Sequence, residues 1–181
     1  MGEPIAPGLS LTGFGIALPD TLMTNQDLVE QQSLDVSADW IERKTGIRSR
    51  AVASPADATS DLATTAVQCA LADARLVSAD LDGLIVATST PDMMQPSTAC
   101  IVQGKLGALG AFAFDVDAVC SGFIYGLVVA ASLMHCDSRL RNVAVVGAEI
   151  YSRILDYGDP TTCTLFGDGA GAVPEQGAGC W

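Results

Sequence analysis

Basic residues are scarce in this sequence: nine Lys and Arg stand against 21 Asp and Glu, which gives a net charge of −12 over 181 residues. Proteins bind nucleic acids by neutralising phosphates with Lys and Arg, so this composition argues against a nucleic-acid partner. Four of the nine positive charges nevertheless fall within eight residues, at Arg43, Lys44, Arg48 and Arg50. Such a cluster can dock a phosphate or an acidic partner in spite of the adverse total. A solvated helix end with salt bridges is the alternative.

Targeting and membrane signals are also missing. The N-terminus has no basic region ahead of an apolar stretch and no Ser or Thr at position 6, so we expect neither a signal peptide nor myristoylation. Gly and Ser interrupt the longest apolar segment, and no uninterrupted run reaches the roughly 18–20 residues that span a bilayer. We therefore expect a soluble, cytoplasmic protein without a membrane segment.

Metal-binding patterns are absent as well. The cysteines show neither CxxC nor Cys/His metal-ligand spacing, so we expect no metal and free thiols in a reducing compartment. There are six of them: Cys69, Cys100, Cys120, Cys136, Cys163 and Cys180.

Only one histidine is present, His135, and it follows Cys120 by 15 residues on one predicted helix. At 1.5 Å per residue the two side chains are roughly 22 Å apart along that helix. A Cys–His dyad needs hydrogen-bond reach, so we expect no such dyad within one chain. We place His135 at the helix C-terminus, where a cation faces the negative end of the dipole.

Strand and helix patterns alternate along the chain. Hydrophobic residues make up 49% and charged residues only 17%, so much of the chain must be buried. Helices are predicted to begin with capping residues at Thr24, Ser37 and Ser60. Strands are predicted at 9–18, 47–53, 84–90, 112–117, 143–149 and 162–172. This order is typical of a mostly parallel sheet with crossover helices, and no linker or repeat divides it.

The most informative feature is the junction at Cys120. Residues 111–117 have the pattern of a short strand, and 120–134 that of a helix apolar on nearly every side, which is normally buried. A helix N-terminus carries unpaired N–H groups and a partial positive charge that favour a thiolate. Cys120 is therefore a candidate nucleophile. The alternative is an inert buried cysteine, one of the most commonly buried residue types.

Four segments in order carry a resemblance to a known family: 40–50, 84–90 with 96–100, 115–123 and 166–173. Together they resemble the ketoacyl-ACP synthase III family, with 115–123 matching the nucleophile segment. The resemblance runs from about Leu9 to Val173. It implies an α/β, thiolase-like fold, of which this chain holds the first βαβαβαββ half: a mixed, mostly parallel sheet with a buried central helix.

The resemblance also implies an activity, that of an acyltransferase-type condensing enzyme in fatty acid or polyketide initiation. Cys120 would accept an acyl group from acyl-CoA, and malonyl-ACP would then decarboxylate and attack it to give a ketoacyl-ACP. The substrates are acyl-CoA and malonyl-ACP, the partners are acyl carrier protein and a second copy in a homodimer, and no cofactor is needed. The family's second half supplies a His and an Asn that stabilise the enolate oxyanion.

Substrate-binding residues follow from the same resemblance. Trp40 aligns with a tryptophan that stacks on the CoA adenine, and Arg43, Lys44 and Thr45 lie in the segment that meets the CoA phosphates. Lys44 replaces an arginine found in many members and loses its bidentate fork. Residues 159–162 replace a stretch that often carries another arginine, and Pro160 offers no donor. An ACP-bound or unusual acyl donor is therefore an alternative to CoA.

A loop after the third strand is expected to contact the partner. Residues 91–96 correspond to the family loop that closes the partner's acyl pocket, with Met93, Met94 and Gln95 where a bulky aromatic is often found. Flexible Met side chains would admit a longer or differently shaped acyl group. The alternative is an ordinary surface loop with one buried methionine.

The C-terminal residues depart from the family. Pro174 follows Val173, and because proline cannot donate to a ladder, we expect the strand at 170–178 to be cut short. We accordingly divide the chain into a half-domain, 1–173, and an aberrant tail, 174–181, produced by a shifted reading frame or a truncated gene model. A naturally short protein is the alternative.

Two functional hypotheses remain open. The first is an incomplete condensing enzyme with Cys120 as acyl acceptor. The second is a non-catalytic remnant or pairing subunit that keeps the dimer surface. A cysteine hydrolase or redox protein has little support, because the sequence has no CxxC and no base within reach. Under either hypothesis, half of a two-half fold should leave a large apolar face uncovered.

Overall fold

The computed structural model describes residues 9–177 and divides into two compact units. The larger one, here the sheet unit, comprises residues 9–17, Ala58–Glu149 and 170–177. The other, here the small unit, comprises Leu18–Asp57 and Ile150–Gly169. The division into 1–173 and 174–181 is a different one and stays a prediction, because residues 178–181 lie outside the described range.

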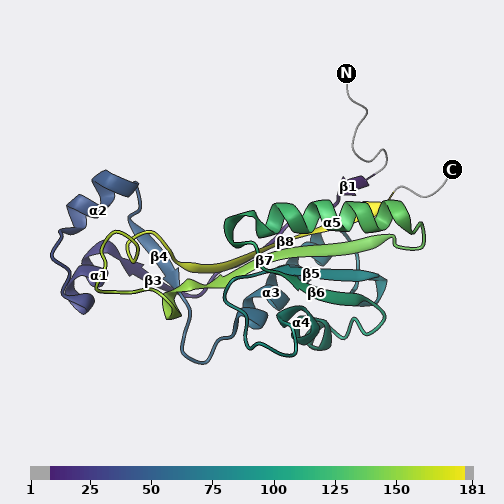
Figure 1. The fold of residues 1–181 in the computed structure, drawn as a ribbon, viewed down its shortest axis with the longest axis horizontal. Coiled ribbons are helices and arrows are strands. Elements are labelled where there is room, and N and C mark those ends of the chain that lie inside the picture. The colour runs from purple at the N-terminus through teal and green to yellow at the C-terminus, as the bar shows by residue number, and fades with distance from the viewer. Residues whose placement is uncertain (1–8, 178–181) are drawn as a thin grey trace, which may run out of the picture. The chain divides into compact units, whose positions relative to one another are not determined.

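The main sheet is mixed, with the order β1-β8-β7-β5-β6, and β2 also pairs with β8 (Figure 1). β5 pairs in parallel with both β6 and β7, whereas β1 and β2 run antiparallel to β8. All five β5 residues are buried, as expected for a strand covered on both faces. The bounds are β1 Leu9–Leu11, β2 Gly15–Ala17, β5 Gly83–Ala87, β6 Phe112–Val116, β7 Asn142–Ile150 and β8 Asp168–Gly177.

Two sequence predictions need correction here. The strand expected at 9–18 is two short strands, β1 and β2, and the strand expected from residue 162 begins only at Asp168. Residues 159–165 instead form turns closed by backbone hydrogen bonds, such as Cys163 N to Asp159 O at 3.1 Å. Thr161 and Thr162 also donate their hydroxyls to the Asp159 carboxylate, and this local bonding competes with a strand ladder.

Helices lie on both faces of this sheet: α5 (Gly122–Cys136) on one, α3 (Thr59–Asp73) and α4 (Thr98–Leu106) on the other (Figure 1). α3 approaches β2 so closely that a Cβ added to Gly15 would lie 2.0 Å from the Ala66 carbonyl oxygen. Only glycine fits such an approach of two backbones. The layers are therefore helix, sheet, helix, as the thiolase-like expectation requires.

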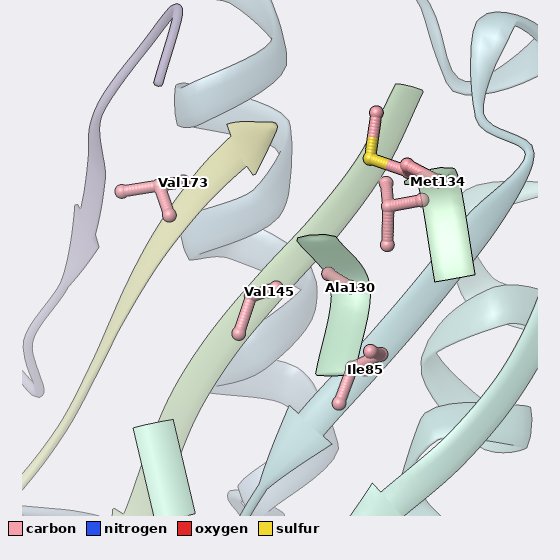
Figure 2. Packing of buried hydrophobic residues seen from close by; sticks show 6 residues of the cluster. Ile85, Ala130, Met134, Val145 and Val173 are labelled. Atoms are coloured by element: carbon pink, nitrogen blue, oxygen red, sulfur yellow. The ribbon is translucent and has the colours of Figure 1, made fainter. Parts of the chain in front are cut away.

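Residues from β5, β7, β8 and α5 itself form the hydrophobic core under α5 (Figure 2). Small and flexible α5 side chains, Ala130 and Met134, pack on branched strand residues, and a Cβ at Gly126 would lie 2.9 Å from Val145 Cγ1. Each fully buried Val or Ile contributes roughly 1.5–3 kcal/mol. The buried members are Ile85, Ala130, Met134, Val143, Val145 and Val173.

The opposite face of α5 is open. Ile124, Tyr125 and Val128 are 58%, 55% and 55% exposed, so within this chain the helix is buried on one side only. The expectation of a helix buried on every side is wrong for the single chain, whereas the expected uncovered apolar face is present. The segment Val119–Cys136 also has the length and hydropathy of a membrane span, contrary to our expectation, although its inner side packs on the sheet.

The small unit pairs a two-stranded sheet, β3 (Thr21–Thr24) with β4 (Ser49–Val52), with helices α1 (Asn25–Gln32) and α2 (Ala38–Thr45). Thr24 accepts from the Asp27 amide, and Ser37 accepts from the Trp40 amide. These bonds confirm the two predicted caps, which satisfy amides that the helices leave unpaired. α2 ends at Gly46 in the left-handed conformation, with φ of 74°.

The predicted strand break at Pro174 is wrong, because β8 continues to Gly177. Leu11 faces Glu175 and Gly15 faces Ala172, so three residues of the N-terminal segment oppose only two of β8. That mismatch is a bulge, one of the few sheet positions that accept proline. The Pro174 carbonyl still accepts from the Thr12 amide at 3.1 Å, so the ladder survives the missing donor.

Candidate active site

Cys120 lies between β6 and α5, in the short 3₁₀ turn Val119–Ser121, and its side chain is exposed. The alternative of a buried cysteine is therefore wrong, and the role of Cys120 as nucleophile stays a prediction. The helix begins two residues later than predicted, at Gly122, and its N-cap Ser121 makes no side-chain capping bond. The first N–H groups of a 15-residue helix thus lack a side-chain acceptor next to an exposed sulfur.

The backbone immediately before the sulfur is strained. Val119 has φ of 49°, in the left-handed region that a β-branched residue rarely adopts. Such a conformation costs on the order of 1–3 kcal/mol and concentrates at functional sites, including nucleophiles on sharp strand-to-helix turns. Because valine is a poor turn residue, the sequence carries no local signal for this conformation.

The start of α5 sits against the carboxyl ends of two parallel strands. A Cβ on Gly122 would lie 3.2 Å from Ala87 Cβ at the end of β5 and 3.4 Å from the Val116 carbonyl at the end of β6. In open α/β sheets, ligands bind outside this edge. Cys120 therefore stands at the edge of the sheet where chemistry is expected.

Glu149 of β7 organises the same region and was missed from the sequence. Its carboxylate accepts from the Ser89 amide at 2.8 Å and the Thr90 hydroxyl at 2.5 Å, with Thr88 Oγ1 at 3.5 Å. These bonds tie the segment after β5 to β7. The available signal was a glutamate at the end of an otherwise apolar strand.

Asp115 of β6, the first residue of the segment 115–123, binds the first turn of α4. Its two carboxylate oxygens accept from the amides of Thr98 and Ala99, each at 2.7 Å. A carboxylate on the first amides of a helix also meets the positive end of the dipole. The strand that leads to Cys120 is thus fastened to the helix beside it.

The predicted CoA-binding residues all lie on α2 of the small unit. Trp40 is half-buried, and Arg43 and Lys44 are exposed in the last turn. Their spacing of three and four residues from Trp40 places both cations on the tryptophan's face of the helix. The Thr45 hydroxyl is occupied within the helix end: it donates to the Ile41 carbonyl at 2.8 Å and accepts from the Ile47 amide at 3.0 Å.

The basic cluster is smaller than the sequence indicates. Arg50 is only 7% exposed and donates to Asn25 Oδ1 at 2.7 Å and to the Thr164 carbonyl at 3.2 Å. Burial lowers the pKa of its guanidinium. Arg48 is exposed, with its Nε 2.7 Å from Glu42 Oε1. Arg50 is therefore a structural residue. Arg43 and Lys44 are left as the exposed cations of α2 that can bind a ligand.

The three loop residues predicted to reach a partner are all exposed. Met94 is 97% exposed and Met93 51%, and Gln95 is exposed beside them. The buried methionine of the surface-loop alternative is therefore not found, and contact of this loop with a partner stays a prediction. The loop joins β5 to α4 in the sheet unit, which also contains Cys120.

An apolar cavity of about 460 Å³ opens on the α5 side of the sheet. Phe123, three residues after Cys120, forms part of its wall. The lining residues are Phe14, Gly15, Ile16, Phe123, Gly147, Gly171, Ala172 and Val173. Phe14 and Ile16 of this lining are exposed, so the cavity adds to the uncovered apolar surface.

His135 is exposed in the last turn of α5, at the opposite end from Cys120, as predicted. The five cysteines within residues 9–177 are free. In that same range no three His, Cys, Asp or Glu side chains gather in a way that could hold a metal ion.

Comparison with known proteins defines the fold class. The chain matches the crystal structure of a 3-oxoacyl-[acyl-carrier-protein] synthase III from Aquifex aeolicus with a TM-score of 0.88 and 44% identity, over 93% of this chain and 54% of that one. A priming β-ketosynthase from the R1128 polyketide pathway gives a TM-score of 0.90 at 30% identity, over 99% and 53%. The fold is therefore thiolase-like α/β.

Sequence comparison narrows this class. Residues 114–174 match the family described as 3-oxoacyl-[acyl-carrier-protein (ACP)] synthase III. A beta-ketoacyl-[acyl-carrier-protein] synthase III from Caldanaerobacter subterraneus is 54% identical over 96% of this chain and 51% of that protein. One from Xylella fastidiosa is 50% identical over 90% and 49%. The chain belongs to the beta-ketoacyl-ACP synthase III family, and it spans about half the length of the curated relatives it matches.

Proposed function

We propose that this chain is the Cys120-bearing part of an acyltransferase-type condensing enzyme that starts fatty acid or polyketide chains. One observation carries the proposal: an exposed cysteine follows a strained residue at the carboxyl edge of the parallel strands, where a helix begins. The family to which the chain belongs gives that cysteine its chemistry.

The first step is transfer of an acyl group to Cys120. The thiolate attacks the thioester carbonyl of acyl-CoA, a new S–C bond forms, and the C–S bond to CoA breaks as the CoA sulfur leaves and takes up a proton. Amides at the start of α5 favour negative charge nearby. This step needs a positioned thiolate and a bound thioester, and it consumes no cofactor.

Binding of CoA is assigned to Trp40, Arg43, Lys44 and Thr45. An indole offers a face for adenine stacking, and the two exposed cations on the same face of α2 suit the phosphates. Lys44 acts as a point charge rather than as a fork. Because the Thr45 hydroxyl is already bonded within the helix end, its contribution is to shape α2 near the ligand.

The second step, condensation with malonyl-ACP, needs more than these residues. The enolate that forms on decarboxylation requires preorganised donors worth roughly 3–4 kcal/mol each. His135, the only histidine, stands at the far end of α5 from Cys120. We therefore propose that this chain accepts an acyl group but does not condense it without the residues that the longer relatives carry.

We also propose a cytoplasmic homodimer that receives malonyl groups from acyl carrier protein. β6 is the last strand at one edge of the sheet. An edge strand presents unpaired backbone groups that can pair with a second chain. The loop with Met93, Met94 and Gln95 leads from β5 into α4, which packs against that strand. Arg43 and Lys44 offer a local positive site for an acidic carrier in spite of the net charge of −12.

Intact-mass measurement after incubation with acetyl-CoA tests the proposal. One acetyl group should appear on the chain, map to Cys120, and be absent from Cys120→Ser. Cys100→Ser, which changes another exposed cysteine, is the matched control and should acylate normally. Added malonyl-ACP should yield no ketoacyl-ACP.

Two results would contradict this assignment. A wild-type chain that remains unacylated would favour a non-catalytic pairing subunit. Full condensing turnover by the chain alone would show that its site is complete.

A further inference from the structure

The first turn of α3 is capped by a residue from elsewhere in the chain. The N-cap position is Ala58, which has no side-chain acceptor, and the predicted cap, Ser60, lies inside the helix and is completely buried. The Ser60 amide donates to Asp92 Oδ1 at 2.9 Å, and its hydroxyl donates to Asp92 Oδ2 at 2.5 Å. Asp92, from the loop after β5, thus takes the place of an N-cap carboxylate.

Lys105 of α4 completes this arrangement. Its ammonium donates to Ser60 Oγ and to Asp61 Oδ1, each at 2.6 Å, and the bond to Lys105 lowers the pKa of Asp61. The Ser60 hydroxyl therefore accepts from a cation while it donates to a carboxylate, and such chains of hydrogen bonds strengthen one another. We call Ser60, Asp92 and Lys105 the polar clamp.

The polar clamp holds the loop that carries the two exposed methionines. On one side, Thr59 Oγ1 donates to the Thr90 carbonyl at 2.6 Å, next to the Ser60–Asp92 bonds. On the other, the Asp92 amide donates to Thr98 Oγ1 at 3.2 Å, and Thr98 is completely buried. The beginning of the loop is thus fastened to α3 and to the first residue of α4, whereas Met94 within the loop is 97% exposed.

We propose that the polar clamp is a positioning device: it fixes the base of the loop 91–97 so that Met93 and Met94 stand at a set place against the partner's acyl pocket. The inference rests on the proposed function, since it assigns the clamp a role in selecting the acyl group. A loop ordered in advance loses less conformational freedom on contact, and the flexible methionines then adjust only locally. Ser60, Asp92 and Lys105 act through the methionines and do not touch the substrate.

Hydrogen–deuterium exchange on the full chain tests the clamp itself. Asp92→Asn and Ser60→Ala should each speed exchange of the amides in 91–97 by about tenfold, the effect of losing one or two buried hydrogen bonds, with strand β7 unchanged. Lys105→Met keeps the aliphatic stem and should give a smaller increase. Arg139→Met removes an exposed ion pair in the same unit and should change nothing in the loop. Unchanged exchange in Ser60→Ala and Lys105→Met would overturn the clamp even if Asp92→Asn fails to fold.

The ratio of two acyl-CoA chain lengths loaded onto Cys120 from a mixture tests the role in selection. General destabilisation lowers both products equally, so it leaves the ratio unchanged. Met94→Ala sets the reference, and the clamp variants should shift the ratio by several-fold in the same direction as Met94→Ala. A faster-exchanging loop with an unaltered ratio would overturn the positioning role. If the wild-type chain is never acylated, the proposed function fails, and the exchange measurement still decides whether the clamp holds the loop.

Discussion

α3 and α5 are both 15 residues long and cover opposite faces of one sheet, but they are buried very differently. α3 buries nine residues and turns polar or small side chains outward. α5 is the more apolar helix, yet it buries only Gly122, Gly126, Ala130 and Met134, and it exposes Ile124, Tyr125 and Val128. A helix that is apolar all round is normally enclosed on all sides. The composition of α5 therefore matches an environment larger than the one this chain provides.

The largest expected effect is on the α3 face. Gly15→Ala would place a methyl group 2.0 Å from the Ala66 carbonyl, where only backbone movement relieves the clash. We expect a loss of about 3 kcal/mol or more in the free energy of unfolding, measured by urea denaturation.

Gly104→Ala on α4 is the matched control, because nothing lies within 4 Å of its added Cβ. That change should be neutral or stabilise by up to about 1 kcal/mol. Equal stability of the two variants would show that α3 does not pack on β2 as described.

The second prediction concerns a buried carboxyl group, that of Glu175, on the α5 face of the sheet. Glu175 lies on the same face of β8 as Val173 and Gly177, because residues two apart on a strand share a face. It is 5% exposed, and its Oε2 has no hydrogen-bond partner. Burial raises its pKa to about 7 from 4.5. Between these pH values the folded state thus holds a proton that the unfolded chain has already lost. The contribution of Glu175 to stability is therefore fully present below about pH 4.5 and is lost as the pH rises to about 7.

Glu175→Gln should remove this fall, which we expect to be about 2 kcal/mol between pH 5 and pH 8 in denaturant titrations. Glu30→Gln, at an exposed site on α1, should leave the pH profile of the wild type intact. A wild-type stability that rises over this range would contradict the assignment to Glu175.

The open face of α5 should drive self-association. Val128→Lys places a charge in the centre of that face at a residue already 55% exposed, so it should weaken association by about tenfold without lowering stability. Sedimentation velocity over a concentration series measures this. Gln68→Lys on the exposed side of α3 adds the same charge and should have little effect. A wild-type chain that sediments as a clean monomer and unfolds cooperatively would mean that the face needs no cover.

The smallest expected effect is a difference in thiol reactivity between the two ends of α5. Cys120 and Cys136 are both exposed, one just before the helix and the other at its last residue. The thiolate that reacts meets partial positive charge at the first end and partial negative charge at the second, so a brief iodoacetamide pulse should label Cys120 about fivefold faster. Peptide mass mapping gives the ratio, with Cys69 and Cys100 as internal references. Equal or slower labelling of Cys120 would remove the argument for its activation.

Much of this protein could be predicted from short stretches of sequence. The caps at Thr24 and Ser37, the apolar strands β5, β6 and β7, and the strand-to-helix junction at Cys120 all depend on residues within a few positions of one another. Local hydrogen bonding and side-chain periodicity act over that range, so these elements appear where the pattern indicates them.

The remaining features depend on residues far apart in the chain, and only the packed structure decides them. Pro174 stays within β8 because a bulge from residues 12–14 faces it. Asp92 caps α3 from 32 positions away because the loop after β5 meets the first turn of that helix. Arg50 belongs to a basic run in sequence, but it is buried where its guanidinium meets Asn25 and Thr164. Burial and long-range hydrogen bonds are properties of the assembled layers, and no window of neighbouring residues contains them.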